Sequence, residues 1–178
     1  MMMRLKASFR ADMRKFSFAI GMIALYTFQP PPGFGAEVIE CQVMSIHDGD
    51  SMRVKCPPQH KSQRLRMHQI DAPELEQAYG PQAKSHLKAL CPIKTRARIR
   101  IHGKDQYGRL LGDVFCRGKN INHEMVASGA AWAYRRYVTD PALPRLQRRA
   151  QQARIGLWGD SNATAPWQWR YYNQGNRR

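Results

Sequence analysis

An Asp48-Gly49 pair joins two segments rich in apolar and β-branched residues, and this pair constrains the fold more than any other local signal. Both residue types tolerate positive φ, so the pair favours a tight hairpin between two antiparallel strands. The strand pattern occurs in residues 38–46, 51–55, 63–70, 95–101 and 110–116. In residues 95–101, arginines alternate with apolar residues, which predicts a half-buried strand with a basic outer face.

Three helices are expected around these strands. They cover residues 81–90, 122 to about 128, and 141 to just before Gly156. Pro81 begins the first, Asn122 caps the second, and Asp140-Pro141 begins the third. The first helix lies between the third and fourth strands, which is the layout of an OB-type barrel. The sequence therefore predicts an α+β, mainly β, fold: a five-stranded OB-fold barrel with three helices, in one domain of residues 37–159.

The two ends of the chain differ from this domain in composition. Residues 1–36 have basic residues followed by an apolar run at residues 17–28, which is typical of a signal segment and is short for a membrane span. We expect an exported protein, periplasmic or secreted, after cleavage near Ala36; the alternative is an uncleaved N-terminal anchor. Residues 160–178 form a polar and aromatic tail. The sequence leaves three alternatives for this tail: it packs on the barrel, it contacts bases, or it is mobile.

The four cysteines favour disulfides, because an exported chain meets an oxidising compartment. They are Cys41, Cys56, Cys91 and Cys116, and no two of them form a C-x-x-C pair, which argues against a zinc site. Three pairings are possible. We favour Cys41–Cys56, which brackets the predicted hairpin, together with Cys91–Cys116. The alternative is four small, buried apolar side chains.

The charge balance indicates a polyanionic partner. Lys and Arg total 29 against 13 Asp and Glu, and the net charge is +16. Such a charge favours nucleic acid, or else an anionic membrane surface. The sequence implies no protein partner, and we expect a monomer.

Acidic residues are scarce, yet several of them gather in two turns, His47–Ser51 and Asp71–Glu74. Turns and strand ends meet at the rim of a barrel, so Asp50 and Asp71 are expected to converge. Two carboxylates with a backbone carbonyl and waters suit a hard cation, most naturally Ca²⁺, with Mg²⁺ also possible. Glu74 is then placed to act as a general base on a water molecule beside that cation.

Two arginines are candidate clamps for a phosphate. Arg66 lies on the third strand, and Arg109 follows a turn just before the fifth. A guanidinium fork matches phosphate oxygens, and two forks beside a cation would stabilise the charge of a phosphoryl transition state. For Arg109 the alternative is an ordinary solvated surface residue.

Taken together, these motifs resemble the thermonuclease family of staphylococcal nuclease-like domains. The shared pattern runs from Cys41 to Trp158, and its parts are D-G-D-S at 48–51, R-x-x-x-I-D-x-P-E at 66–74, Y-G-P-x-A at 79–83, D-x-Y-G-R at 105–109, G-x-x-I-N at 118–122 and G-L-W at 156–158. The resemblance implies a five-stranded OB barrel with three helices. It also implies Ca²⁺-dependent endonucleolytic hydrolysis of DNA and RNA that leaves 3′-phosphate ends.

The resemblance assigns roles position by position. The implied cation ligands are Asp50, Asp71 and the carbonyl of Ala72, and the implied catalytic residues are Arg66, Glu74 and Arg109. Tyr107 and Tyr137 match tyrosines that line the nucleotide pocket, and Asn122 matches a structural asparagine. Arg135 replaces an aromatic residue, which implies weaker base stacking and an added phosphate contact. We expect an exported calcium-dependent nuclease; the alternative is a non-catalytic nucleic-acid-binding module on the same barrel.

Overall fold

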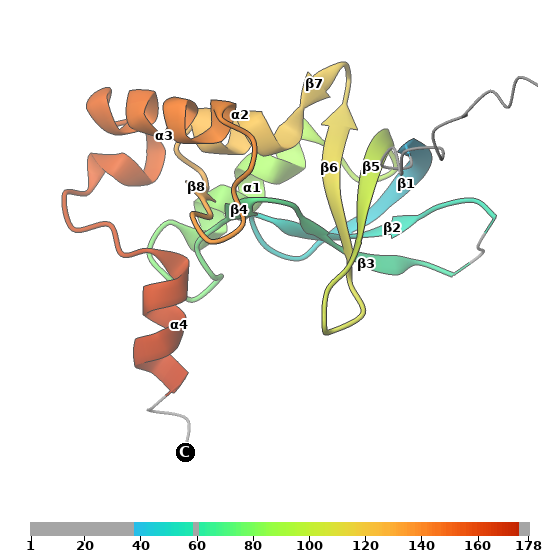
Figure 1. The fold of residues 1–178 in the computed structure, drawn as a ribbon, viewed down its shortest axis with the longest axis horizontal. Helices are drawn as coiled ribbons and strands as arrows, with labels where there is room; N and C mark the ends of the chain where they lie inside the picture. The colour runs from blue at the N-terminus through green and yellow to red at the C-terminus, as the bar shows by residue number, and fades with distance from the viewer. Residues whose placement is uncertain (1–37, 59–60, 175–178) are drawn as a thin grey trace, which may run out of the picture. The chain divides into compact units, whose positions relative to one another are not determined.

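The computed structural model describes residues 38–58 and 61–174, which belong to one compact unit (Figure 1). The strands are β1 (Val38–Ile46), β2 (Ser51–Lys55), β3 (Gln63–Met67), β4 (Ile70–Asp71), β5 (Arg96–Lys104), β6 (Leu110–Cys116), β7 (Lys119–Asn120) and β8 (Trp132–Ala133). The helices are α1 (Gly80–Leu90), α2 (Ile121–Ala127), α3 (Ala142–Gln152), the 3₁₀ helix η1 (Gly156–Gly159) and α4 (Pro166–Gln174). The expected signal segment, residues 1–36, lies outside the described residues. Within the described part, no helix has the length and apolar content to cross a membrane.

Five of the described strands close into a barrel. Their order is β3-β2-β1-β5-β6, with antiparallel pairing at each step, and a parallel pairing of β3 with β6 completes the circle. Closure leaves these strands without an open sheet edge. Helix α1 lies in the connection between β3 and β5, as expected. The predicted mainly β OB-fold barrel is therefore confirmed.

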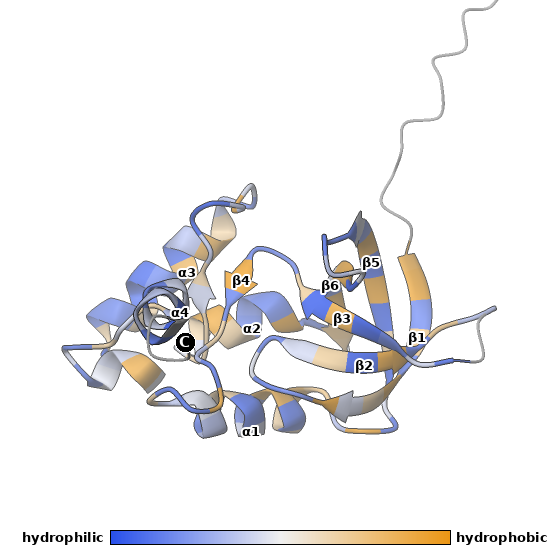
Figure 2. Ribbon diagram, turned by 90° about the horizontal axis from the view of Figure 1, so that it is seen from below, coloured by the Kyte–Doolittle hydropathy of each residue, from blue (hydrophilic) through white to orange (hydrophobic). Residues whose placement is uncertain are grey.

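Side chains that alternate along the strands fill the barrel interior. Along β5, Ala97 and Ile99 are fully buried, whereas Arg96, Arg98 and Arg100 are exposed, as the sequence predicts. Figure 2 shows the corresponding alternation of polar and apolar bands. The other four barrel strands contribute the fully buried residues Val43, Val54, Leu65 and Val114. Each buried aliphatic side chain contributes about 1.5–3 kcal/mol, so this shared interior holds the strands together.

Two disulfides each tie a barrel strand to a segment outside that strand. Cys41–Cys56 ties β1 to the residue that follows β2, and Cys91–Cys116 ties the end of α1 to β6. Both pairings that the sequence favours are confirmed, and all four cysteines are buried. Such links stabilise a fold mainly by constraining the unfolded chain.

The predicted third strand, residues 63–70, is wrong beyond Met67. Gln69 has a φ of 65°, and the turn that it forms separates β3 from β4. Its backbone carbonyl accepts from the nitrogen of Tyr134, and its Oε1 accepts from the nitrogen of Asp140, both at 2.8 Å. Strand β4 consequently leaves the barrel and pairs with β8, which positions Asp71 at the rim.

Asn122 is a buried bridge and not the predicted helix cap. The cap of α2 is Asn120, whose Oδ1 accepts from the nitrogen of His123 at 3.3 Å. Asn122 is 2% exposed; its Oδ1 accepts from the nitrogen of Val114 at 2.9 Å, and its Nδ2 donates to the carbonyl of His68 at 2.8 Å. The side chain therefore ties α2 to β6 and to the turn between β3 and β4.

The last two helices differ from the prediction in extent. Asp140 Oδ1 accepts from the nitrogen of Ala142 at 2.8 Å, but the N-cap of α3 is Pro141 and the helix begins at Ala142, one residue later than predicted. The helix ends at Gln152, earlier than predicted, and Arg154 just beyond it has a φ of 52°. Residues 156–159 then form η1, and the tail forms a fourth helix, α4, to which the sequence assigns no structure.

We expect Asn122→Ala to destabilise the protein more than Asn120→Ala. The first change leaves the buried groups of Val114 and His68 without their partner, at a cost of about 3 kcal/mol. The second removes one partly buried helix cap, at about 1 kcal/mol. Urea unfolding followed by circular dichroism measures both losses. Equal losses, or a larger loss for Asn120→Ala, would contradict the bridging role of Asn122.

Candidate active site

Asp50 and Asp71 converge at one rim of the barrel, as expected. Asp50 follows the β1–β2 turn and Asp71 ends β4, and their exposures are 3% and 0%. Asp50 Oδ2 accepts from the backbone nitrogen of Ala72 at 2.6 Å. This bond joins the two acidic turns directly. The part of these residues in holding a cation stays a prediction.

Asp48 shapes the first turn. Its Oδ1 accepts from the nitrogens of Asp50 at 3.0 Å and Ser51 at 2.7 Å, and the hydroxyl of Ser51 donates to its Oδ2 at 2.8 Å. Gly49 lets the turn approach the second acidic segment, because a Cβ at this position would lie 2.6 Å from the Cβ of Ala72 and 2.8 Å from that of Ala83. The absence of a side chain at residue 49 therefore sets the position of Asp50.

One guanidinium connects the two buried carboxylates. Arg66 Nη1 forms an ion pair with Asp50, and Arg66 Nη2 donates to Asp71 Oδ1 at 2.6 Å. The Arg66 side chain is only 13% exposed. Two carboxylates so close together would repel each other and lose hydration, and a shared buried arginine offsets both effects.

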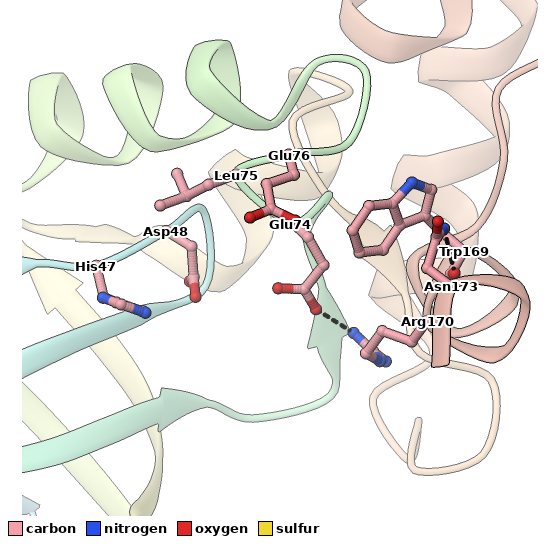
Figure 3. Close-up of a pocket in the computed structure, with 8 residues that line it drawn as sticks. All are labelled: His47, Asp48, Glu74, Leu75, Glu76, Trp169, Arg170 and Asn173. Atoms are coloured by element: carbon pink, nitrogen blue, oxygen red, sulfur yellow. Dashed lines mark hydrogen bonds and ion pairs between the residues drawn. The ribbon is translucent and has the colours of Figure 1, made fainter. Parts of the chain in front are cut away.

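A second arginine reaches the same carboxylates from helix α4. Arg170 donates to Asp71 Oδ1 at 3.2 Å and to Asp71 Oδ2 at 2.7 Å. It also donates to Glu74 Oε1 at 2.7 Å (Figure 3). Burial alone lowers the pKa of Arg170, but the hydrogen bonds and charges of Asp71 and then Glu74 raise it overall. The residue is thus held as a cation between the two acidic groups.

Sequence reasoning missed Arg170 because its partners lie 99 and 96 residues away in the chain. One signal was present: the sequence contains no Asp or Glu after Asp160. An arginine in such a tail has no acidic neighbour within its own helix, so any acidic partner that it has lies elsewhere in the fold.

Glu74 and Arg170, at the edge of this cluster, line a pocket of about 330 Å³. Its lining residues are His47, Asp48, Glu74, Leu75, Glu76, Trp169, Arg170 and Asn173. Figure 3 shows the β1–β2 turn and the loop after β4 on one side, with α4 on the other. A pocket with a few convergent polar groups beside aromatic surface is the usual form of a small-ligand site.

Arg109 does not join this cluster. Its Nε donates to Asp105 Oδ2 at 2.7 Å and its backbone nitrogen donates to Asp105 Oδ1 at 2.9 Å. Burial alone raises the pKa of Asp105, but the bonds from Arg109 lower it overall. Among the described residues, no hydrogen bond or ion pair links Arg109 to the carboxylates at the rim. Tyr107 lies beside Arg109, 5.6 Å from its guanidinium, and is 65% exposed.

The other predicted substrate residues lie in the loop between β8 and α3. Tyr137 is 50% exposed and packs edge-on against Tyr134 at 5.0 Å, and Tyr134 stacks on Trp167 of α4 at 5.4 Å. Arg135 is exposed. The roles of Tyr137 and Arg135 in nucleotide binding stay predictions.

The residues at the rim fit a hard cation. Asp50, Asp71 and the carbonyl of Ala72 offer oxygen donors, which Ca²⁺ and Mg²⁺ prefer. Both carboxylates are buried, and in the structure their negative charge is met by positive groups, Arg66 and Arg170. Positive charge at this point is therefore a requirement of the fold.

A second group that could hold a metal ion, His68, His102 and Asp113, was also missed. His102 Nε2 lies 2.9 Å from Asp113 Oδ2, His68 Nδ1 lies 3.7 Å from Asp113 Oδ1, and the candidate ligand atoms lie within 4.8 Å of one another. The two imidazole rings are stacked at 4.2 Å with 27° between their planes. Because ligand lone pairs lie in the ring planes, rings stacked in this way do not both point at one ion.

Comparison with known proteins places the chain in a family. Residues 64–160 match the family described as staphylococcal nuclease homologue. The chain belongs to the staphylococcal nuclease family. An Escherichia coli protein named as an uncharacterized endonuclease is 42% identical over 134 residues, which is 75% of this chain and 86% of that protein. A Haemophilus influenzae protein of the same description is 43% identical over 130 residues, covering 73% of this chain and 72% of its own.

A plant member is similar over a shorter stretch. A staphylococcal-like nuclease of Arabidopsis thaliana is 36% identical over 115 residues, which is 65% of this chain and 35% of the plant protein. The residues that match the staphylococcal nuclease family include Arg66, Asp71, Glu74 and Arg109. Arg170 lies beyond the matched range, so the contact that it makes with Asp71 comes from a segment outside it.

We expect Gly49→Ala to lower the free energy of unfolding by about 2 kcal/mol, because the new methyl group would overlap the Cβ atoms of Ala72 and Ala83. Gly159→Ala is the matched control, since a Cβ there meets its nearest atom at 3.7 Å. Its effect should stay within about 0.5 kcal/mol. Thermal and urea unfolding measure both variants, and an equal effect of the two would contradict the close approach at residue 49.

The carboxylate of Asp113 should contribute stability that depends on pH. Burial alone raises the pKa of Asp113, but hydrogen bonds and charges of His68 and His102 lower it overall. A lowered carboxyl pKa gives stability that is present above the ordinary value, near 3.8, and is lost as the pH falls through the lowered value. Asp113→Asn should therefore cost about 1 kcal/mol at pH 5 and less at pH 3. Urea unfolding at both pH values checks this, and a loss that is the same at both would contradict it.

Proposed function

We propose that this chain is a cation-dependent nuclease that hydrolyses phosphodiester bonds of DNA and RNA. The observation that carries the proposal is the joining of Asp50, Asp71 and Arg66 at the barrel rim, next to Glu74, which lines the pocket and shares Arg170 with Asp71. Relatives named as endonucleases and nucleases support the substrate class. The net charge of +16 supports a polyanionic substrate.

Asp50, Asp71 and the carbonyl of Ala72 are the residues that would hold Ca²⁺, or Mg²⁺ in its place. When bound, the cation would supply Lewis-acid stabilisation of the charge that develops on the phosphoryl oxygens. The convergence of the two acidic turns, which the bond from the nitrogen of Ala72 to Asp50 Oδ2 holds together, supports this assignment, because hard cations prefer several oxygen donors at one point.

Glu74 would accept a proton from the water molecule that attacks phosphorus. The water oxygen forms the new bond to phosphorus and the bond to the 5′ oxygen breaks. The 5′ oxygen takes a proton from solvent water and leaves as a hydroxyl, and the phosphate stays on the 3′ end. Glu74 lines the pocket and is partly exposed, so its carboxylate can reach a water molecule there. It must first exchange its hydrogen bond with Arg170, because a carboxylate oxygen bound to a guanidinium is a poorer base.

Arg66 and Arg109 would donate to the phosphate oxygens. Arg66 already lies at the carboxylates, whereas Arg109 would have to exchange Asp105 for the phosphate. Tyr107 and Tyr137 would flank the nucleotide, and Arg135 would contact a neighbouring phosphate; their exposure supports this.

We also propose that the protein is exported to an oxidising compartment. The two disulfides support export, because such bonds persist outside reducing compartments. The basic and then apolar composition of residues 1–36 supports it as well. Retention by an uncleaved anchor is the alternative.

A non-catalytic nucleic-acid-binding module is the second candidate. The observation that favours it is that Arg109 is paired with Asp105 while Glu74 and Asp71 are paired with Arg170. On this alternative the basic outer face would bind nucleic acid, and the rim would be a static ion-pair network.

Digestion of plasmid DNA and RNA, in Ca²⁺, in Mg²⁺ and in chelator, distinguishes the two candidates. We expect cleavage with Ca²⁺ and none with chelator. Glu74→Gln should lower kcat about 10²–10⁴-fold, because it removes the proton acceptor and leaves the side-chain shape.

The matched control is Glu40→Gln, which removes an exposed carboxylate on β1 that pairs with Arg96. It should leave kcat within about twofold, since surface ion pairs have small effects. A folded protein that binds nucleic acid but shows no cleavage at any Ca²⁺ concentration would reject the enzyme and favour the binding module. Full activity of Glu74→Gln would remove Glu74 from the mechanism.

A further inference from the structure

Both carboxylate oxygens of Asp71 are already occupied by guanidinium groups. Oδ1 accepts from Arg66 at 2.6 Å and from Arg170 at 3.2 Å, and Oδ2 accepts from Arg170 at 2.7 Å. The side chain of Asp71 has no exposed surface through which a further group could reach it. A divalent cation at Asp71 would therefore compete for these oxygens, and it would repel two neighbouring positive charges.

The two arginines differ in how firmly they are held. Arg66 comes from a barrel strand, contacts both Asp50 and Asp71, and is 13% exposed. Arg170 comes from α4, outside the barrel, and is 32% exposed. Arg170 is therefore the partner that a cation can displace without disturbing the barrel.

Helix α4 is seated firmly at its beginning and exposed at its end. Ala165, just before the helix, is 2% exposed, and the preceding carbonyl of Thr164 accepts from Gln77 Nε2 at 2.6 Å. In the second half, Tyr171 and Tyr172 are 77% and 68% exposed. The ion pairs of Arg170 are thus the main polar contact between this exposed half and the rim, among the described residues.

We propose that Arg170 is a built-in counter-cation that covers the carboxylate site and competes with the divalent cation. This inference rests on the proposed function, because it takes Asp50 and Asp71 to bind that cation. In the cation-free chain, Arg170 neutralises Asp71, engages Glu74 and forms part of the pocket wall. Loading of the cation releases Arg170, and the same exchange frees Glu74 to accept a proton. The tail is thereby an autoinhibitory element whose release is linked to cation binding.

The consequence for affinity follows from linkage. Cation binding has to displace Arg170. The measured Ca²⁺ affinity is therefore reduced by the free energy that the ion pairs of Arg170 with Asp71 and Glu74 contribute. Arg170→Gln removes this competition. We expect it to bind Ca²⁺ about tenfold more tightly than the unaltered chain, within the usual range of such couplings.

Calorimetric Ca²⁺ titration of the full chain tests this directly. The matched control is Arg148→Gln, because Arg148 is an exposed arginine of α3 and its loss changes the net charge by the same amount. The control should change the affinity by less than about twofold, since a distant surface charge is screened by salt. Equal gains in Arg170→Gln and Arg148→Gln would mean that overall charge, and not competition by Arg170, sets the Ca²⁺ affinity.

A structural readout complements the affinity. Hydrogen exchange of the amides of α4 should become faster when Ca²⁺ is added to the unaltered chain, because Arg170 no longer ties the helix to the rim. In Arg170→Gln, exchange should be fast with or without Ca²⁺. Exchange in α4 that slows or stays unchanged on cation binding would overturn the proposal.

A second variant guards against a folding defect. Arg170→Lys keeps the charge but loses the two-pronged contact with Asp71, so its Ca²⁺ affinity should fall between those of the unaltered chain and Arg170→Gln. Circular dichroism and thermal unfolding establish that each variant is folded. Weaker Ca²⁺ binding by both folded variants would show that Arg170 supports the site and does not compete for it.

The outcomes separate this inference from the proposed function. If the unaltered chain binds Ca²⁺ and cleaves nucleic acid, but Arg170→Gln binds no more tightly, the inference fails and the nuclease assignment stands. If the unaltered chain neither binds the cation nor cleaves, the proposed function fails and the inference fails with it.

Discussion

The structure depends on one shared ion pair, in which Arg66 joins the buried carboxylates of Asp50 and Asp71. Two negative charges at 3% and 0% exposure would be unfavourable without a positive partner in the same buried place. The backbone bond from Ala72 to Asp50 fixes the distance between the two acidic turns. The hairpin, the third strand and the strand after it must therefore all end at one point on the rim.

The barrel and its attachments satisfy that requirement. Parallel pairing of β3 with β6 closes the barrel and sets the direction of Arg66. The turn at Gln69 then takes the chain out of the barrel, so that Asp71 comes back towards the first hairpin. Asn122 holds this turn from α2, through the carbonyl of His68. The buried hydrogen bonds of Asn122 and the closed barrel sheet thus both hold the segments that carry the site.

The tail adds a component that the barrel does not contain. Helix α4 carries Arg170 to the carboxylates from a segment beyond the residues that match the staphylococcal nuclease family. The site holds two guanidinium groups where a hard cation would bind. In the cation-free chain these groups neutralise the buried carboxylates. Exchange of the Arg170 guanidinium for a divalent cation would couple three events: cation binding, proton acceptance by Glu74 and access to the pocket.

The sequence favoured the observed disulfide pairing among three possible ones. By itself it determined the first hairpin, the barrel strands except for the end of the third, and the carboxylates and Arg66 at the rim. These depend on signals within a few residues: alternation, turn-forming pairs, and the spacing of Arg66, Asp71 and Glu74. Only the tertiary structure decided that the third strand stops before Gln69, that Arg109 pairs with Asp105, and that Arg170 covers the site. The physical reason is that hydrogen bonds and ion pairs between distant segments have no period in the sequence. They form only after the barrel has brought those segments together.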